Sequence, residues 1–217
     1  MRKAKGMFIV LGLALVASLY FMVSARSKEP SVLDEVLADF VMSIFQEPSY
    51  PFFTMISELG DKLGIGIVAL LVLLWIWLKK RDYIGMVVFV LAVGLGNEVS
   101  KWIKELVGRE RPVFDQVDVA ESLSFPSGHA MVGFILYMLA AHFLAENVKS
   151  NGVKLAIGLL AFVIVLLIGL SRIVLQAHFP TDVLGGYTIG AAWTILWIIF
   201  YDWMYERFPK KIEAIGG

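Results

Sequence analysis

The sequence contains no cysteine and carries no net charge. Without cysteine the chain has no disulfide framework, no thiolate metal site and no cysteine nucleophile. A formal net charge of +0 gives no indication of a nucleic-acid partner. Charged residues are also scarce, at 18% of the 217 residues, whereas 59% are hydrophobic. This balance excludes a disordered chain and disfavours an ordinary water-soluble globule.

Long apolar runs account for most of this composition. Six stretches approach the roughly 20 residues that a helix needs to cross a bilayer, and aromatic side chains lie near their ends. Because the stretches are apolar on every face, membrane spans are favoured over buried helices of a soluble bundle. We predict an all-α integral membrane protein forming a single domain, residues 1–217. The expected spans are Met7–Val23, Leu63–Leu78, Tyr83–Gly96, Ala130–Ala145, Val153–Leu170 and Val183–Tyr201.

The ends of three spans allow alternatives. A basic start before the first span and Val23-Ser24-Ala25 at its end resemble a signal peptide. The apolar run is longer than a usual signal sequence, so an uncleaved anchor is favoured. A turn at 52–60 would lengthen the second span, and the third can extend toward Trp102.

The placement of basic residues predicts the orientation. With the N-terminus inside, the short inner segments hold more than half of the 19 lysines and arginines, and the first outer loop is acidic. The positive-inside rule therefore places both termini in the cytoplasm of a multi-pass cell-membrane protein. The inner basic residues are Arg2, Lys3, Lys5, Lys79, Lys80, Arg81, Lys149, Lys154, Arg207, Lys210 and Lys211.

The first outer loop has the pattern of an amphipathic helix. Ser31 and Asp34 have the spacing of a capping box, and apolar residues then recur at helical spacing as far as Ile44. Pro48 and Pro51 are expected to end this helix. It either lies on the outer leaflet or forms a lid packed on the protein.

Polar residues concentrate in three clusters near the span ends, where they are functional candidates. Consecutive spans alternate in direction. The outer ends of spans three and five therefore face the same aqueous surface as the outer starts of spans four and six. The clusters are Lys104–Pro112, Pro126–His129 and Ser171–Asp182.

The first property shared by the clusters is an affinity for anions. Lys104, Arg111 and Arg172 are cations, and a guanidinium fork fits phosphate oxygens. Ser127 and Gly128 precede a helix, whose first N–H groups favour an anion. These five residues predict a phosphate-binding site.

The second property is nucleophilic chemistry. A carboxylate at Asp182 accepting the Nδ1–H of His178 would leave Nε2 free to attack phosphorus. His129 would then protonate the leaving oxygen and later take a proton from water. The set predicts phosphoryl transfer without a metal.

Other polar residues are expected to have structural roles. His142 lies near the inner interface, and Glu98 is spaced to pair with Lys101. Arg109 and Glu110 flank the first cluster and are expected to be solvated or to face lipid headgroups. Two consecutive glycines, at 185 and 186, suggest close helix packing.

Together the clusters resemble the signature of the type 2 phosphatidic-acid phosphatase superfamily, which includes vanadium haloperoxidases and glucose-6-phosphatase. Its pattern is K-x6-RP, PSGH and SR-x5-H-x3-D. Every fixed position is present: Lys104, Arg111, Pro112, Pro126, Ser127, Gly128, His129, Ser171, Arg172, His178 and Asp182.

The resemblance implies a six-helix fold with an extracytoplasmic site that needs no cofactor or Mg²⁺. It implies that His178 is the nucleophile and forms a phosphohistidine, that Asp182 supports it, and that His129 is the general acid. The phosphate would be bound by Lys104, Arg111, Ser127, Gly128 and Arg172.

Size and loop layout resemble bacterial phosphatidylglycerophosphatase B-type members. This likeness implies hydrolysis of phosphatidylglycerol phosphate, with undecaprenyl diphosphate, phosphatidic acid and diacylglycerol pyrophosphate as alternatives. The expected partners are a membrane lipid phosphate and the bilayer, with no nucleic acid and no obligate protein partner. An anionic-lipid transporter is the non-enzymatic alternative, although ionisable residues are missing from mid-span. A vanadate-dependent oxidase or a transphosphorylase is a further alternative, and the membrane spans count against the soluble oxidases.

Overall fold

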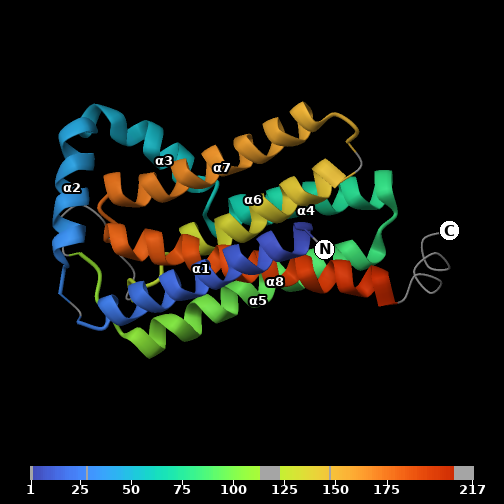
Figure 1. Ribbon diagram of the computed structural model, residues 1–217. Coiled ribbons are helices and arrows are strands. Elements are labelled where there is room, and N and C mark those ends of the chain that lie inside the picture. The colour runs from blue at the N-terminus through green and yellow to red at the C-terminus, as the bar shows by residue number, and fades with distance from the viewer. Residues whose placement is uncertain (1, 28, 113–122, 147, 208–217) are drawn as a thin grey trace.

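The computed structural model describes residues 2–27, 29–112, 123–146 and 148–207, and these residues form helices and connecting segments without a strand. Lys210 and Lys211, which contributed to the predicted orientation, lie outside the described residues. The helices are α1 (Arg2–Ala25), α2 (Val32–Ile44), a 3-10 turn (Glu47–Ser49), α3 (Tyr50–Glu58), α4 (Lys62–Trp75), α5 (Tyr83–Val107), α6 (Gly128–Glu146), α7 (Asn151–Val174) and α8 (Pro180–Arg207) (Figure 1).

Six helices in the described chain are long and apolar enough to cross a membrane, which confirms the predicted all-α membrane architecture. They are α1, α4 with its π-helical extension Ile76–Lys80, α5, α6, α7 and α8. Most extend beyond the apolar runs because a helix continues until a cap or turn ends it. Helix α5, for example, ends at Val107 and is capped by Gly108, which has a φ of +68°.

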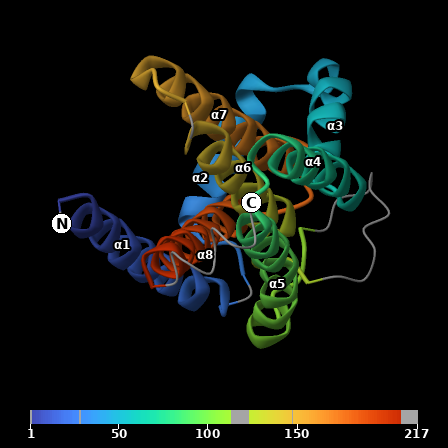
Figure 2. The same cartoon turned by 90° about the vertical axis from the view of Figure 1, so that its right-hand side faces the viewer.

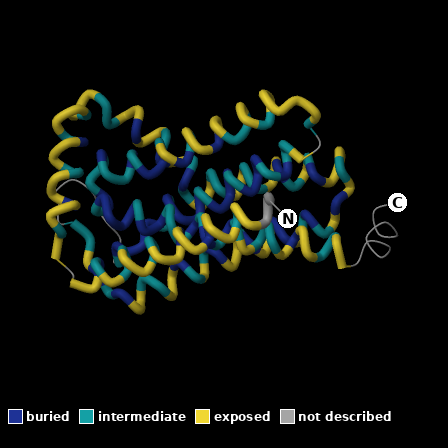
Figure 3. The backbone as a smooth tube through the Cα atoms, in the orientation of Figure 1, coloured by how far each residue is buried: buried dark blue, intermediate teal, exposed yellow. Residues whose placement is uncertain are grey.

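Helix α6 lies in the centre of the bundle, with α4, α5, α7 and α8 around it (Figure 2). Its side chains Met131, Ile135 and Leu136 are fully buried. By contrast, α1 packs along α8 at the periphery, and its outward residues such as Val16 are 70% exposed. Figure 3 shows this division between the buried interior and exposed outer helices. An exposed apolar surface of this kind fits a surrounding of lipid.

Glycine brings α8 unusually close to α6, as the pair at 185 and 186 predicted. A Cβ on Gly186 would lie 2.9 Å from the carbonyl oxygen of Ser127, and one on Gly190 would lie 2.9 Å from that of Met131. A Cβ on Gly185 would lie 2.3 Å from the ring of Phe125. These approaches join the start of α8 to the segment that leads into α6.

Helix α2 lies across one end of the bundle (Figure 1). Its predicted capping box is confirmed, since Ser31 and Asp34 bond to each other's backbone N–H groups. The inner face is a lid packed on the protein, where Val41 contacts Phe53 and Val174. The opposite face exposes apolar side chains, so contact with the outer leaflet stays a prediction. The exposed residues are Val32, Leu33, Val36, Phe40 and Ile44.

Two expectations for this region were wrong. Helix α2 ends at Ile44, before either proline, and Pro51 lies at the beginning of α3. Residues 52–60 do not lengthen the second span, because α3 is a separate helix that packs against α7. Proline is tolerated in a first helical turn, so it starts a helix here as readily as it ends one.

Candidate active site

The three polar clusters lie at the same end of the bundle, beneath α2. Lys104 is in the last turn of α5, Arg172 is in the last turn of α7, and Asp182 is in the first turn of α8. The remaining candidates flank these helix ends, with His129 at the start of α6 and His178 between α7 and α8. Alternation of the spans places the clusters as predicted.

His178 is held in a tight turn after α7. Its N–H and that of Ala177 both donate to the carbonyl of Arg172, and Gln176 adopts a left-handed φ of +55°. The His178 side chain is buried, with 3% of the residue exposed. Burial, together with the positive charges of Arg111 and Lys104, lowers the pKa of His178 to about 4 despite the nearby Asp182 carboxylate. The ring is therefore neutral at pH 7, as a nucleophile must be.

A serine lies between the nucleophile candidate and its carboxylate. Nδ1 of His178 is 3.7 Å from Oδ2 of Asp182, too long for the direct hydrogen bond that the spacing predicted. The hydroxyl of Ser124 instead donates to Oδ2 and lies 3.3 Å from Nδ1. In the tautomer that leaves Nε2 free, Nδ1–H donates to this hydroxyl. Sequence reasoning missed Ser124, whose only signal was its position just before the PSGH motif.

Asp182 is fully buried and accepts two further hydrogen bonds through its carboxylate. Its Oδ2 also accepts from the N–H of Phe179 at 3.0 Å, and its Oδ1 accepts from Arg109 at 2.8 Å. The carbonyl of Asp182 accepts from the N–H of Ser127 at 3.0 Å. Asp182 thus joins the His178 turn to the start of α6.

His129 lies beside a different carboxylate. Its Nε2 is 3.9 Å from Oδ1 of Asp61, in the corner between α3 and α4, and a Cβ on Gly60 would lie 3.0 Å from its ring. The ring also interacts electrostatically with the charges of Arg172 and Arg111. His129 and His178 therefore have separate acidic partners, which suits separate roles in proton transfer.

The three predicted cations gather beside these histidines. Lys104 interacts electrostatically with Arg111, Asp182 and Arg172, and its Nζ contacts the carbonyl oxygens that precede Phe125. Nη1 of Arg111 donates to the carbonyl of Ala177 at 3.2 Å. Burial lowers the pKa of Arg111 from its ordinary value. Three cations brought together in this way form a site that favours an anion.

Three buried donors at this end have no hydrogen-bond partner among the described residues, namely Nε of Arg172, Nε of Arg109 and Oγ of Ser100. Ser100 is one helical turn before Lys104 on α5. The Cβ position of Gly128 is open, with Oγ of Ser100 as its nearest neighbour at 3.9 Å. Unsatisfied buried donors beside an open backbone position are typical of a site awaiting a polar ligand.

One prediction about this region was wrong. Arg109 was expected to be solvated or to face headgroups, but only 1% of it is exposed, and it forms ion pairs with Asp34 and Asp182 at 2.8 Å. Spacing in the sequence cannot separate a buried arginine from a solvated one within the same charged run. The other neighbours behave as expected, since Glu98 and Lys101 form an exposed ion pair.

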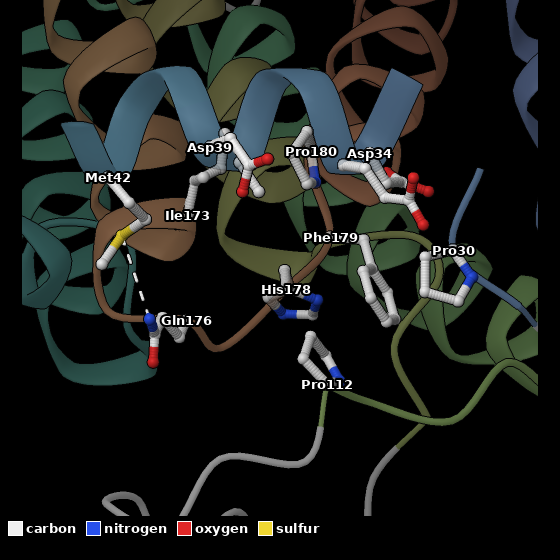
Figure 4. Close-up of a pocket in the computed structure, with 12 residues that line it drawn as sticks. Pro30, Asp34, Asp39, Met42, Pro112, Ile173, Gln176, His178, Phe179 and Pro180 are labelled. Carbon is white, nitrogen blue, oxygen red and sulfur yellow. Dashed lines mark hydrogen bonds between the residues drawn. The ribbon is translucent and has the colours of Figure 1, made fainter. Parts of the chain in front are cut away.

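A cavity of about 510 Å³ leads to His178 between α2 and the turn. Figure 4 shows His178 beneath α2, with Asp34 and Asp39 on the helix side and Pro112 on the other. The cavity gives the buried imidazole an approach from outside the bundle.

Comparison with known proteins agrees with this geometry. The PAP2 superfamily profile matches residues 83–206, which include all three motif clusters. Phosphatidylglycerophosphatase B of Bacillus subtilis is 28% identical over 89% of this chain and 96% of its own length. The putative undecaprenyl-diphosphatase YbjG of Escherichia coli is 30% identical over 76% of this chain and 82% of its own.

Two solved structures share the fold. The crystal structure of the transmembrane PAP2-type phosphatidylglycerolphosphate phosphatase from Bacillus subtilis superposes with a TM-score of 0.78 at 28% identity, covering 90% of this chain and 98% of that one. Aquifex aeolicus LpxE superposes with a TM-score of 0.60 at 23% identity, covering 79% and 98%. Since the profile match spans more than half of the chain and contains every motif position, this protein belongs to the PAP2 superfamily, as one of its membrane-embedded phosphatases.

Proposed function

We propose that this protein hydrolyses the phosphomonoester of phosphatidylglycerol phosphate to phosphatidylglycerol and inorganic phosphate. The main observation is the convergence of a buried neutral imidazole, a second imidazole and three cations at one end of a membrane bundle. The similarity in sequence and in structure to phosphatidylglycerol phosphate phosphatase of Bacillus subtilis, along nearly its whole length, supports the substrate.

In the first step, Nε2 of His178 attacks phosphorus in line with the ester oxygen. The Nδ1 proton stays on the ring, bonded to Ser124, and Asp182 stabilises the positive charge that develops. The bond between phosphorus and the lipid oxygen breaks as His129 donates a proton to that oxygen, and the lipid alcohol leaves. Lys104, Arg111, Arg172 and the N–H groups near Gly128 stabilise the equatorial oxygens.

In the second step, the phosphohistidine is hydrolysed. His129, now neutral, takes a proton from a water molecule whose oxygen attacks phosphorus. The bond between phosphorus and Nε2 of His178 breaks, and inorganic phosphate is released with both histidines in their starting states. The overall reaction consumes one water molecule and leaves no net change in the protons or electrons of the protein.

Protein cations supply the charge stabilisation that a metal would provide in this scheme. Ammonium and guanidinium groups are donors and do not coordinate metals. Activity is therefore expected to be unchanged when purified protein is incubated with EDTA and assayed for phosphate release. Loss of activity in EDTA that added Mg²⁺ or Zn²⁺ restores would contradict this part of the proposal.

Activity is also expected to persist well below pH 6.5. The pKa of His178 is lowered to about 4, and only the neutral ring attacks, so the rate falls when pH drops through that value. In a profile of kcat/KM against pH, the acidic limb is the region where kcat/KM falls as the pH is lowered. Its midpoint should lie between about pH 4 and about pH 5. A limb near 6.5 would mean that His178 is solvated or is not the nucleophile.

We further propose that the site faces the outside of the cell. The beginning of α1 and the end of α8 lie toward the end of the bundle away from α2 (Figure 1), as does the basic segment Lys79–Arg81 between α4 and α5. The positive-inside rule assigns that end to the cytoplasm. Modification by a membrane-impermeant reagent of a cysteine introduced at exposed Glu47, but not at exposed Lys149, in intact cells would support this sidedness.

A substrate panel tests the function as a whole. Purified protein in liposomes is supplied with phosphatidylglycerol phosphate, phosphatidic acid or undecaprenyl diphosphate at matched surface density, and free phosphate is measured. The proposal expects the highest kcat/KM for phosphatidylglycerol phosphate. Preference for the diphosphate would favour the lipid-carrier role suggested by the Escherichia coli relative. Binding of all three without phosphate release would favour a transporter.

A further inference from the structure

Arg109 is a buried arginine at the centre of the site that none of the proposed steps uses. One nitrogen, Nη1, donates to Oδ1 of Asp182 at 2.8 Å and to Oγ1 of Thr181 at 2.9 Å. The other, Nη2, donates to Oδ2 of Asp34 at 2.8 Å and to the carbonyl of Glu29 at 3.2 Å. The guanidinium therefore connects the carboxylate behind the nucleophile to a carboxylate on α2.

The fork geometry has a consequence for Asp182. Arg109 occupies Oδ1, which leaves Oδ2 for Ser124 and the N–H of Phe179. The guanidinium also stacks 4.1 Å from the centre of the Phe179 ring, next to the nucleophile in the chain. Rotation of the Asp182 carboxylate would break its bonds to Arg109, Ser124 and Phe179. Arg109 therefore keeps the oxygen that supports His178 in place.

Asp34 anchors the other side of Arg109. Its Oδ1 accepts from the N–H of Thr181 at 2.8 Å, and its Oδ2 accepts from the N–H of Ser31 at 3.0 Å. Burial disfavours the charged carboxylate, but the hydrogen bonds from Arg109, Ser31 and Thr181 outweigh it, and the pKa of Asp34 lies below its ordinary value. Asp34 is therefore a carboxylate, although only 1% of the residue is exposed.

The charges of the three residues do not cancel. Two carboxylates and one guanidinium leave a net charge of minus one at the back of His178. If Asp34 were neutral, the guanidinium would cancel Asp182, and the imidazolium formed on phosphorylation would lose its counter-charge in a buried setting where such charges matter most. Four other titratable groups near His178 are basic: Lys104 of α5, Arg111, His129 of α6 and Arg172 of α7. Two acidic residues of α2, Glu35 and Asp39, line the cavity in front of His178, and neither is hydrogen-bonded to Asp182 among the described residues.

We propose that Asp34 and Arg109 are positioning residues of the phosphatase reaction that act through Asp182. Arg109 orients the Asp182 carboxylate toward Ser124 and His178. Asp34 neutralises the charge of Arg109, so that the negative charge of Asp182 remains available to stabilise the phosphorylated imidazole. Helix α2 is then part of the catalytic machinery as well as a cover over it. This inference rests on the proposed function.

Charge-neutralising variants of nearly equal size test it. Asp34→Asn removes one negative charge and is expected to lower kcat about 10-fold or more, with KM changed less than about 3-fold, because the lost stabilisation acts in the transition state. The acidic limb of kcat/KM should move to lower pH, since removal of a negative charge favours neutral His178. Arg109→Met removes a positive charge and should move the limb to higher pH.

The double variant Asp34→Asn, Arg109→Met restores the net charge of minus one. The midpoint of its acidic limb is expected to return close to that of the parent protein. Its kcat stays low, because Arg109 no longer orients the Asp182 carboxylate. Glu98→Gln is the matched control, because it removes an equal charge from an exposed ion pair on α5 and should leave kcat and the limb unchanged. All proteins are compared in the same liposomes with the same substrate. Ionisation of the substrate then affects every pH profile equally and does not contribute to the differences between variants.

The inference is overturned if the limb stays fixed in Asp34→Asn and activity falls only in proportion to the folded fraction, measured by size exclusion and helical circular dichroism. If Arg109→Met does not fold, Asp34→Asn decides alone by the same criterion. Failure of the proposed function has a different result, because the parent protein would then release no phosphate, or His178→Ala would remain active.

Discussion

Replacement of His178 by alanine is expected to abolish phosphate release from every lipid substrate, with a loss of at least about 10⁴-fold in kcat. The reason is structural as well as chemical. Through Ser124 this imidazole is linked to the Asp182 carboxylate. It also interacts with the positive charges of Lys104 and Arg111. Water cannot use that link in its place, because the covalent bond to Nε2 is what divides the reaction into two easier steps.

The measurement combines turnover with detection of the intermediate. Parent protein quenched in acid-free conditions after mixing with ³²P-labelled lipid should carry an acid-labile label, and His178→Ala should carry none. His142→Ala is the control. His142 is a half-buried histidine of α6 that lies away from the site end, and its Nε2 has no hydrogen-bond partner among the described residues. Retention of label or turnover in His178→Ala would remove the nucleophile from the scheme.

Replacement of Gly186 by alanine is expected to lower kcat/KM about 100-fold, although no functional group is lost. The added Cβ would lie 2.9 Å from the carbonyl oxygen of Ser127 and 3.1 Å from the N–H nitrogen of Met131, so two backbones must separate. Separation moves the Ser127–Gly128 segment away from Asp182, which is bonded to it. A displacement of about 1 Å in an active site can cost about 10²-fold in rate.

A second glycine provides the matched control. Gly158 on α7 has nothing within 4 Å of its Cβ position, so Gly158→Ala should leave turnover unchanged and gain slightly in helix propensity. Both variants are measured for phosphate release and for thermal stability in the same detergent. Full activity in Gly186→Ala would mean that the contact between α6 and α8 tolerates expansion and does not set the geometry of the site.

Several features of the chain were predictable because they depend on local pattern and on the bilayer alone. The length of the apolar runs predicts six spans, and alternation of their direction predicts that Lys104, His129 and His178 share one end. The capping box at Ser31 depends on four consecutive residues, so it too could be read directly. These inferences need no knowledge of how the helices pack.

Other features needed the packing of distant segments. Asp34, Arg109 and Asp182 are separated by more than 70 residues at each step, and nothing in their spacing distinguishes a buried triad from solvated charges. Ser124 is a small polar residue in a connecting segment, and its place between His178 and Asp182 follows only from the close approach of α8 to α6. The end of α2 at Ile44 was missed because proline both starts and ends helices.

The sequence by itself determined that the protein lies in a lipid bilayer, how many spans it has and which residue types gather at one end. These features follow from the length of each apolar run and from the alternating direction of successive spans. The tertiary structure alone decided which charges are buried together and how the nucleophile is held. Those outcomes depend on distances between helices, and small residues such as Gly186 set these distances only once the helices meet.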